Sequence, residues 1–161
     1  MRFDPPPHRL ESRASRTRYI VFSLVGAALT STYVTQPVLP VLEAEFGVAA
    51  SVASLSVSAV VAGIAVASLP FGMLADRWPV KRLIMVGGVA VSACCITVAL
   101  THTFAVLVLT RFVQGLFMPA LTSCVAAYLA RSLPRDELNV AMGAYVAATV
   151  AGGLGGRLLG G

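Results

Sequence analysis

An arginine and a glutamine stand three residues apart in the middle of an apolar segment. Arg111 is the only charged residue between Phe104 and Ala130, and Gln114 follows it by about one helical turn, on the same face. If this segment crosses a membrane, the guanidinium must face the interior of a helix bundle, water or a polar partner, which predicts a functional site. Gln114 would then hydrogen-bond substrate or water. The alternative is that Arg111, about 10 Å inside the nearer boundary, extends its side chain to the headgroups.

A second polar cluster is the stretch GMLADRWPVKR, residues 72–82, which separates two apolar segments. Gly72 allows another backbone to approach closely, and Asp76 at a membrane boundary needs a cation or a helix N-terminus as its partner. The cluster reads as a hairpin between two helices; its simplest alternative is an ordinary basic loop. Positive charge at the headgroup level comes from Arg77, Lys81 and Arg82.

Two further polar side chains lie near the start of the chain, in STYVTQPVLPVL. Tyr33 and Gln36 share a helix face and are predicted to line a cavity, although helix packing alone would explain the pattern equally well. Pro37 and Pro40 would loosen the same helix near its outer end.

Small residues recur every four positions near the end of the chain. Such a stripe allows close contact between helices, because packing rather than hydrophobicity drives helix association in lipid. A neighbouring stripe holds Tyr145, Thr149 and Arg157, of which the first two would face substrate or pack in the core. The helix-packing motif is predicted at Gly152, Gly156 and Gly160, continuing from Ala144 and Ala148.

The sequence gives little support for a catalytic function. The seven Asp and Glu residues all fall outside the apolar segments, and His8 and His102 lack a nucleophile and base at a suitable spacing. The three cysteines, Cys94, Cys95 and Cys124, fall inside apolar segments and read as packing residues. We expect neither an enzyme nor a cofactor or metal site.

The composition places these residues in a membrane protein. Hydrophobic residues make up 57% of the 161, the mean hydropathy is +0.84, and a helix needs about 20 apolar residues to cross the hydrocarbon. Every apolar segment is too long for a strand. The fold class is therefore an all-α membrane protein, and its five transmembrane helices are predicted at about 19–42, 51–75, 83–101, 104–130 and 138–161.

The distribution of charge predicts the topology. Residues 1–18 form a basic, proline-containing tail that either contacts anionic lipid or sets orientation. That tail and the loops 76–82 and 131–137 hold ten of the twelve Lys and Arg residues, whereas the loops 43–50 and 102–103 hold none. Positive residues stay cytoplasmic, so we expect a cytoplasmic N-terminus in the inner membrane. The net charge of +5 then reflects topology and does not indicate nucleic-acid binding.

The loop residues Gly72, Leu74, Ala75, Asp76, Arg77, Lys81 and Arg82 resemble the loop signature of the major facilitator superfamily, and RFVQG (111–115) is similar to a motif of its drug:proton antiporter branch. The first helix resembles that of arabinose-efflux-like members. The resemblance implies that residues 19–161 form part of an N-terminal six-helix half. It implies a conformational latch in the loop, proton coupling at Arg111, and export of small organic molecules by proton antiport.

Members of that family have twelve helices, so the resemblance also implies that a sixth helix and a second half are missing here. We expect a truncated chain with little transport of its own, whose partners are membrane lipid, an unidentified small-molecule substrate, and the missing half or another chain. The alternative is a non-transporting membrane protein that oligomerises or binds a partner through the glycine-rich fifth helix.

Overall fold

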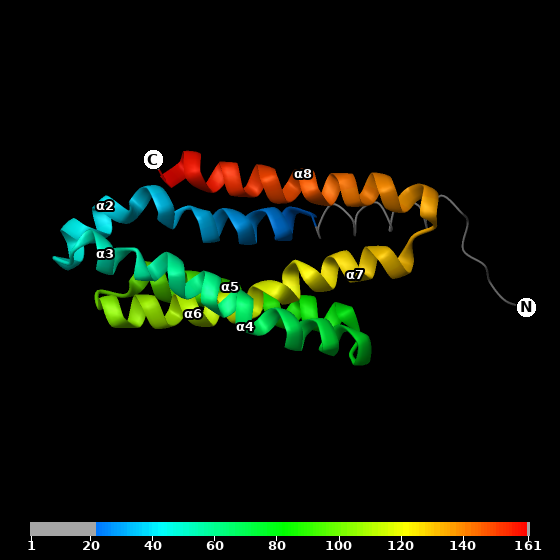
Figure 1. The fold of residues 1–161 in the computed structure, drawn as a ribbon, viewed down its shortest axis with the longest axis horizontal. Helices are drawn as coiled ribbons and strands as arrows, with labels where there is room; N and C mark the ends of the chain where they lie inside the picture. The colour runs from blue at the N-terminus through cyan, green and yellow to red at the C-terminus, as the bar shows by residue number, and fades with distance from the viewer. Residues whose placement is uncertain (1–21, 161) are drawn as a thin grey trace, which may run out of the picture.

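The computed structural model describes residues 22–160 as a bundle of α-helices with no strand in that range (Figure 1). The tail predicted at 1–18 and the start of the first predicted span lie outside the described residues. Residues 22–33 form the first described helix. It is followed by α2 (Thr35–Phe46), α3 (Ala50–Ala53), α4 (Leu55–Arg77), α5 (Val80–Leu100), α6 (Phe104–Leu121), α7 (Ser123–Ser132) and α8 (Arg135–Gly160).

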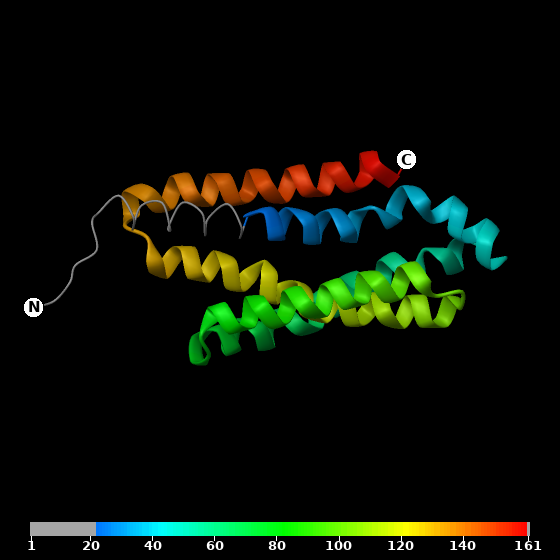
Figure 2. The ribbon, with the colours of Figure 1, turned by 180° about the vertical axis from the view of Figure 1, so that it is seen from behind.

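The helices form two groups. The 22–33 helix and α2 lie beside α8, while α4, α5 and α6 lie beside one another (Figure 1, Figure 2). Two buried clusters join the groups, and both include the 22–33 helix. The Val25 cluster holds residues of α7 and α8 and packs against Ile84 of α5, and Ala28 packs with Val91 of α5 and Met118 of α6. The 22–33 helix is thus the element that connects the two groups.

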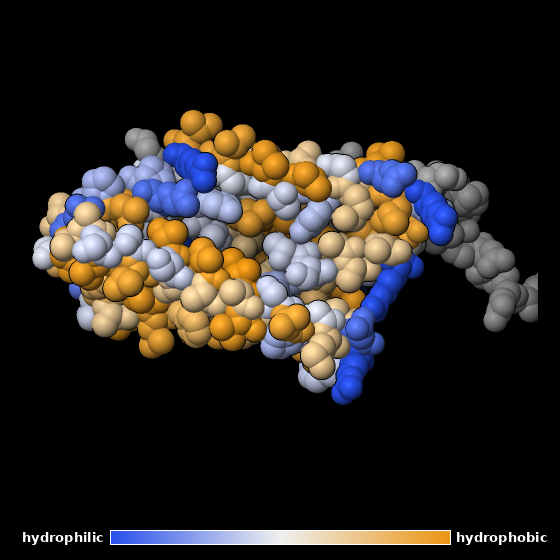
Figure 3. Space-filling model, viewed as in Figure 1, coloured by the Kyte–Doolittle hydropathy of each residue, from blue (hydrophilic) through white to orange (hydrophobic). Residues whose placement is uncertain are grey.

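Four helical stretches in the described part of the chain are long and apolar enough to cross a membrane: Ala50–Arg77, Val80–Leu100, Phe104–Arg131 and Glu137–Gly160. Their outward positions carry large apolar side chains, such as Leu69, Val89 and Leu158, which are 79%, 71% and 81% exposed. Figure 3 shows orange, hydrophobic residues along much of the length of the molecule. Apolar side chains on the outside are expected where lipid is the solvent, so the fold is that of an all-α, multi-pass membrane protein.

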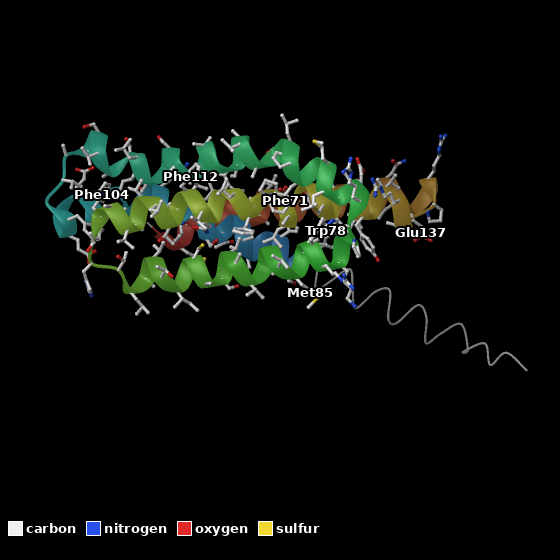
Figure 4. All side chains as sticks on the ribbon, turned by 90° about the horizontal axis from the view of Figure 1, so that it is seen from below. Phe71, Trp78, Met85, Phe104, Phe112 and Glu137 are labelled. Atoms are coloured by element: carbon white, nitrogen blue, oxygen red, sulfur yellow. The ribbon has the colours of Figure 1, made fainter. Side chains whose placement is uncertain are left out.

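The connections lie at two opposite ends. The α4–α5 turn and the α7–α8 connection are at one end, and the α2–α3 and α5–α6 connections are at the other (Figure 1). Figure 4 shows the same division, with Trp78 and Glu137 at one end and Phe104 at the other. The connections that the charge pattern assigned to one side of the membrane are therefore grouped together in space.

The hairpin in GMLADRWPVKR is tighter than the predicted loop at 76–82. α4 continues to Arg77 and α5 begins at Val80, which leaves only Trp78 and Pro79 between them. Trp78 is extended, with φ −110° and ψ 152°, because a residue before proline avoids the helical region. Proline thus ends one helix and opens the next.

Two interruptions also follow from proline chemistry. Val34 separates the 22–33 helix from α2, and Pro37, three residues later, has no N–H for the Tyr33 carbonyl. Pro119 lies one turn before Thr122, where α6 gives way to α7. α6 and α7 nevertheless form one candidate membrane span, Phe104–Arg131.

α4 and α6 approach each other through two glycines. A Cβ added at Gly63 would overlap the carbonyl oxygen of Phe112 and lie 2.9 Å from the backbone nitrogen of Leu116. A Cβ added at Gly115 would overlap the carbonyl oxygen of Val60. The two backbones are therefore in direct contact, and this contact fixes the position of Arg111 and Gln114, which precede Gly115 on α6.

Candidate functional site

Arg111 and Gln114 lie together in the interior of the bundle. Arg111 is 6% exposed and Gln114 is completely buried. Nη1 of Arg111 donates one hydrogen bond of 2.9 Å to Oε1 of Gln114 and another of 3.0 Å to the backbone carbonyl oxygen of Ser31. The three-residue spacing on α6 places the two side chains on one face, as the sequence predicted. In the structure Gln114 bonds to Arg111 and Ser31, whereas substrate or water was the expected partner.

Ser31 on the 22–33 helix completes this network. Its hydroxyl donates to the Ala28 carbonyl oxygen at 2.7 Å and accepts from Nε2 of Gln114 at 3.1 Å. Nε2 also lies 3.8 Å from Sγ of Cys95 on α5. The network therefore links three helices, and Arg111 points inward instead of toward the headgroups, which was the alternative for this side chain.

Tyr33 and Gln36 lie outside the hydrogen-bond network of Arg111 and Gln114. Oε1 of Gln36 accepts a 3.0 Å hydrogen bond from Nε of Arg157 on α8, and the same guanidinium lies 5.5 Å from the centroid of the Tyr33 ring. An open cleft of about 430 Å³ adjoins them, lined by Tyr33, Thr149 and Arg157 among others. Arg157, which the sequence analysis placed on a neighbouring stripe of α8, is thus the partner of both Tyr33 and Gln36.

Asp76 has a partner within the chain that the sequence did not assign. Its Oδ1 accepts a hydrogen bond from Nη2 of Arg131 on α7, and Nη1 of Arg131 donates to the Ala75 carbonyl oxygen at 3.1 Å. Both side chains of this ion pair are more than half exposed. The three basic residues of the predicted latch, Arg77, Lys81 and Arg82, are also exposed. A Cβ added at Gly72 would meet nothing within 4 Å.

The glycine stripe of α8 packs against the first described helix and its continuation. A Cβ added at Gly152 would overlap the Gly26 carbonyl oxygen, and one at Gly156 would lie 2.5 Å from the Thr30 carbonyl oxygen. At Gly160 a Cβ would lie 2.5 Å from the Val34 carbonyl oxygen. The hydroxyl of Thr30 lies 3.0 Å from the Gly152 carbonyl oxygen. The chain itself occupies the stripe, so the alternative in which the stripe binds another chain lacks a free surface there.

Sequence reasoning missed Ser31, Arg131 and Thr35. Ser31 and Thr35 belong to the only hydroxyl-rich stretch of the first span, TSTYVT, which was a usable signal. Arg131 was counted only as a basic loop residue. Among residues 22–160, no group of three His, Cys, Asp or Glu side chains could hold a metal ion.

An arginine buried across three helices of a multi-pass bundle is typical of proteins that move charge or solutes across a membrane. Comparison with known families makes the class specific. Residues 21–161 match the family described as Major Facilitator Superfamily. The chain belongs to this superfamily of transporters.

Individual relatives agree with the family. The chain is 31% identical over 147 residues to a Bacillus subtilis protein described as the uncharacterized MFS-type transporter YybF, covering 89% of this chain and 36% of that protein. It is 27% identical over 146 residues to the inner membrane transport protein YnfM of Escherichia coli, covering 91% and 35%. It is 32% identical over 97 residues to the methyl viologen resistance protein SmvA of Salmonella typhimurium, covering 58% and 19%. The chain spans about a third of the length of the first two relatives.

Proposed function

We propose that this chain is one part of a proton-coupled exporter of small organic molecules in the inner bacterial membrane. The observation that carries the proposal is the buried contact of Arg111 with Gln114 and the Ser31 backbone, deep in a bundle that belongs to a transporter family. Because relatives are about three times as long, the rest of the transport pathway would come from sequence beyond these residues. By itself the chain would transport little.

Arg111 would act electrostatically. A guanidinium stays charged at any physiological pH, so it does not carry the transported proton itself. A fixed positive charge favours the ionised form of a nearby acid and thereby sets when that acid releases its proton. None of the carboxylates at the described positions lies within a span away from its ends, so the proton carrier would be supplied by another part of the transporter.

The open cleft beside Tyr33 and Arg157 would contribute to the substrate pathway. It combines an aromatic ring, a hydroxyl from Thr149 and a cation in about 430 Å³. An amphipathic organic molecule is bound by such a mixture of apolar surface and a few polar groups. Methyl viologen is a suitable probe because the name of one relative connects that protein with resistance to it.

The hairpin between α4 and α5 would serve as the latch. Asp76 is held by Arg131, the basic side chains around it are exposed, and the helix surface at Gly72 is open. The surface at Gly72 is therefore open to the approach of another segment. These features support docking of another part of the transporter at this end, in one of its conformations.

Transport is tested with a chimera in which this chain replaces the matching segment of SmvA. We expect the chimera to restore growth in methyl viologen, and Arg111→Ala in the same chimera to reduce proton-coupled methyl viologen flux in inverted vesicles by at least tenfold. Vesicles that contain the 161-residue chain alone should show no flux. A membrane-inserted chimera that confers no resistance, or one whose coupling survives Arg111→Ala, contradicts the proposal.

The orientation is tested by thiol labelling in a background that lacks Cys94, Cys95 and Cys124. Positive residues concentrate near the α4–α5 turn, so that end should be cytoplasmic. A membrane-impermeant maleimide should label His102→Cys in intact cells and Trp78→Cys only in inverted vesicles, since both positions are exposed. Labelling of Trp78→Cys in intact cells would show the opposite orientation.

A further inference from the structure

Among residues 22–160, two buried side-chain polar atoms have no hydrogen-bond partner, and their residues line the same cleft. They are Nε of Arg111 and Oγ1 of Thr35. The residues are 6% and 5% exposed, so bulk water does not satisfy these atoms. The cleft has a volume of about 260 Å³ and lies between α2, α5 and α6. An unsatisfied polar group buried in this way is unfavourable, so a ligand that offers acceptors to these side chains would be stabilised in the cleft.

The geometry of the guanidinium group indicates what kind of occupant fits. Nη1 already makes the two hydrogen bonds to Gln114 and Ser31, and among the described residues Nη2 makes none. The N–H of Nε and one N–H of Nη2 are parallel and lie on the same edge of the planar group. That edge matches the two oxygens of a carboxylate. The Thr35 hydroxyl supplies one more donor.

The positive charge of Arg111 also indicates an anionic ligand. Among the described residues Arg111 has no carboxylate partner, whereas the exposed Arg131 has Asp76. A buried cation without a counter-ion is strongly disfavoured, and more so at membrane depth. An anion in the cleft would balance the charge and offer acceptors to the two residues, Arg111 and Thr35, that line it.

The cleft is accessible from the end of the molecule that carries the α5–α6 turn. Its lining includes the exposed side chains of Glu45 and His102 near that end, and apolar residues such as Val38, Leu42 and Leu107 farther in. Solvent screens the negative charge of Glu45 at this exposed position. The volume of about 260 Å³ is ample for a small ion such as formate, and the mostly apolar walls disfavour a polyhydroxylated anion such as gluconate.

We propose that this cleft is a binding site for a small monocarboxylate anion, held by the Nε–Nη2 edge of Arg111 and by the hydroxyl of Thr35. The site is separate from the cleft at Tyr33 and Arg157, and its existence does not depend on export or on proton coupling. It assigns to the buried arginine a ligand of its own, in addition to its contacts with Gln114 and Ser31.

The test is thermal unfolding of the detergent-solubilised chain at constant ionic strength, with sodium formate replacing sodium gluconate. Formate should raise the Tm saturably, as binding to the folded state requires. Thr35→Val should weaken the apparent formate affinity about 2- to 13-fold, the value of one net hydrogen bond. Thr97→Val makes the same change on α5, at an exposed hydroxyl bonded within its own helix, and should leave the affinity unchanged.

A second measurement separates an anion site from a water-filled cleft. Without formate, Thr35→Val should raise the Tm, because it removes an unsatisfied buried hydroxyl. Absence of a saturable formate effect on the wild type overturns the proposal. Equal stabilisation by chloride also overturns it, because chloride lacks the two oxygens that match the parallel N–H groups of Nε and Nη2. Loss of transport in the chimera would leave this binding result unaffected, so the two proposals fail independently.

Discussion

Replacing Gly63 by alanine is expected to lower the free energy of unfolding of the solubilised chain by about 1–3 kcal/mol, the usual range for an overpacked contact. The added methyl would overlap the Phe112 carbonyl oxygen and press on the backbones of Gly115 and Leu116. These neighbours are backbone atoms, which cannot rotate away as a flexible side chain does. α4 and α6 must therefore separate. The measurement is unfolding by added SDS in mixed micelles, followed by circular dichroism.

Gly72→Ala is the matched control, because it makes the same change on the same helix. Nothing lies within 4 Å of a Cβ at Gly72, so only the intrinsic helix preference changes. That preference favours alanine over glycine by about 1 kcal/mol in soluble helices. We expect unchanged or slightly raised stability. An equal loss in both variants would show that the α4–α6 contact at Gly63 is not the close approach described here.

The consequence reaches beyond stability, since the Gly63–Gly115 contact also determines where the arginine network sits. Arg111 and Gln114 precede Gly115 by four residues and one residue on α6. A shift of α6 away from α4 would change the distance between Arg111 and the Ser31 carbonyl oxygen, which is 3.0 Å. Close helix packing at glycine thus positions the candidate functional group, although neither glycine touches it.

Spacing along a single helix predicted part of this site. The three-residue separation of Arg111 and Gln114 was sufficient to place both on one face, and the structure brings them within 2.9 Å. The length and apolarity of the segments predicted the four candidate membrane spans among residues 22–160, because a helix that satisfies its own backbone is the simplest structure that spans lipid. Such inferences need only local geometry.

Contacts between helices were harder to predict, because they depend on the relative depth and rotation of two segments. Ser31 pairs with Arg111 across 80 positions of sequence, and Arg157 pairs with Gln36 across 121. The helical period specifies which residues share a face but not which helix that face meets. For the same reason the Arg131 partner of Asp76 was not assigned.

The buried network itself is tested by Gln114→Leu, which we expect to destabilise the chain by about 1–3 kcal/mol. Gln114 accepts from Nη1 of Arg111 and donates to Oγ of Ser31, and both bonds are lost. Leucine has a similar volume, so little of the effect comes from a cavity. The larger contribution is the cationic N–H that remains buried without an acceptor. Unfolding in mixed micelles measures the change.

Gln36→Leu provides the comparison, since Gln36 also accepts a hydrogen bond from an arginine. Arg157 is exposed, so water replaces the lost acceptor and the expected change is within about 0.5 kcal/mol. The same leucine substitution thus removes an arginine–glutamine bond in the interior and at the surface. If both variants lose equal stability, leucine is disruptive in this bundle for reasons unrelated to the burial of Arg111.

A double-mutant cycle decides whether Arg111 and Gln114 act as a unit. Arg111→Met removes the charge and leaves an unbranched side chain of similar length, so in that background Gln114→Leu no longer strands a buried cation. The loss caused by Gln114→Leu should then shrink by at least about 1 kcal/mol, within the range of coupling for residues in one network. Additive effects would mean that the guanidinium finds another acceptor when Gln114 is removed. A large coupling would make the pair a single charged element that joins α6 to the 22–33 helix, so any movement between these helices would have to break its hydrogen bonds.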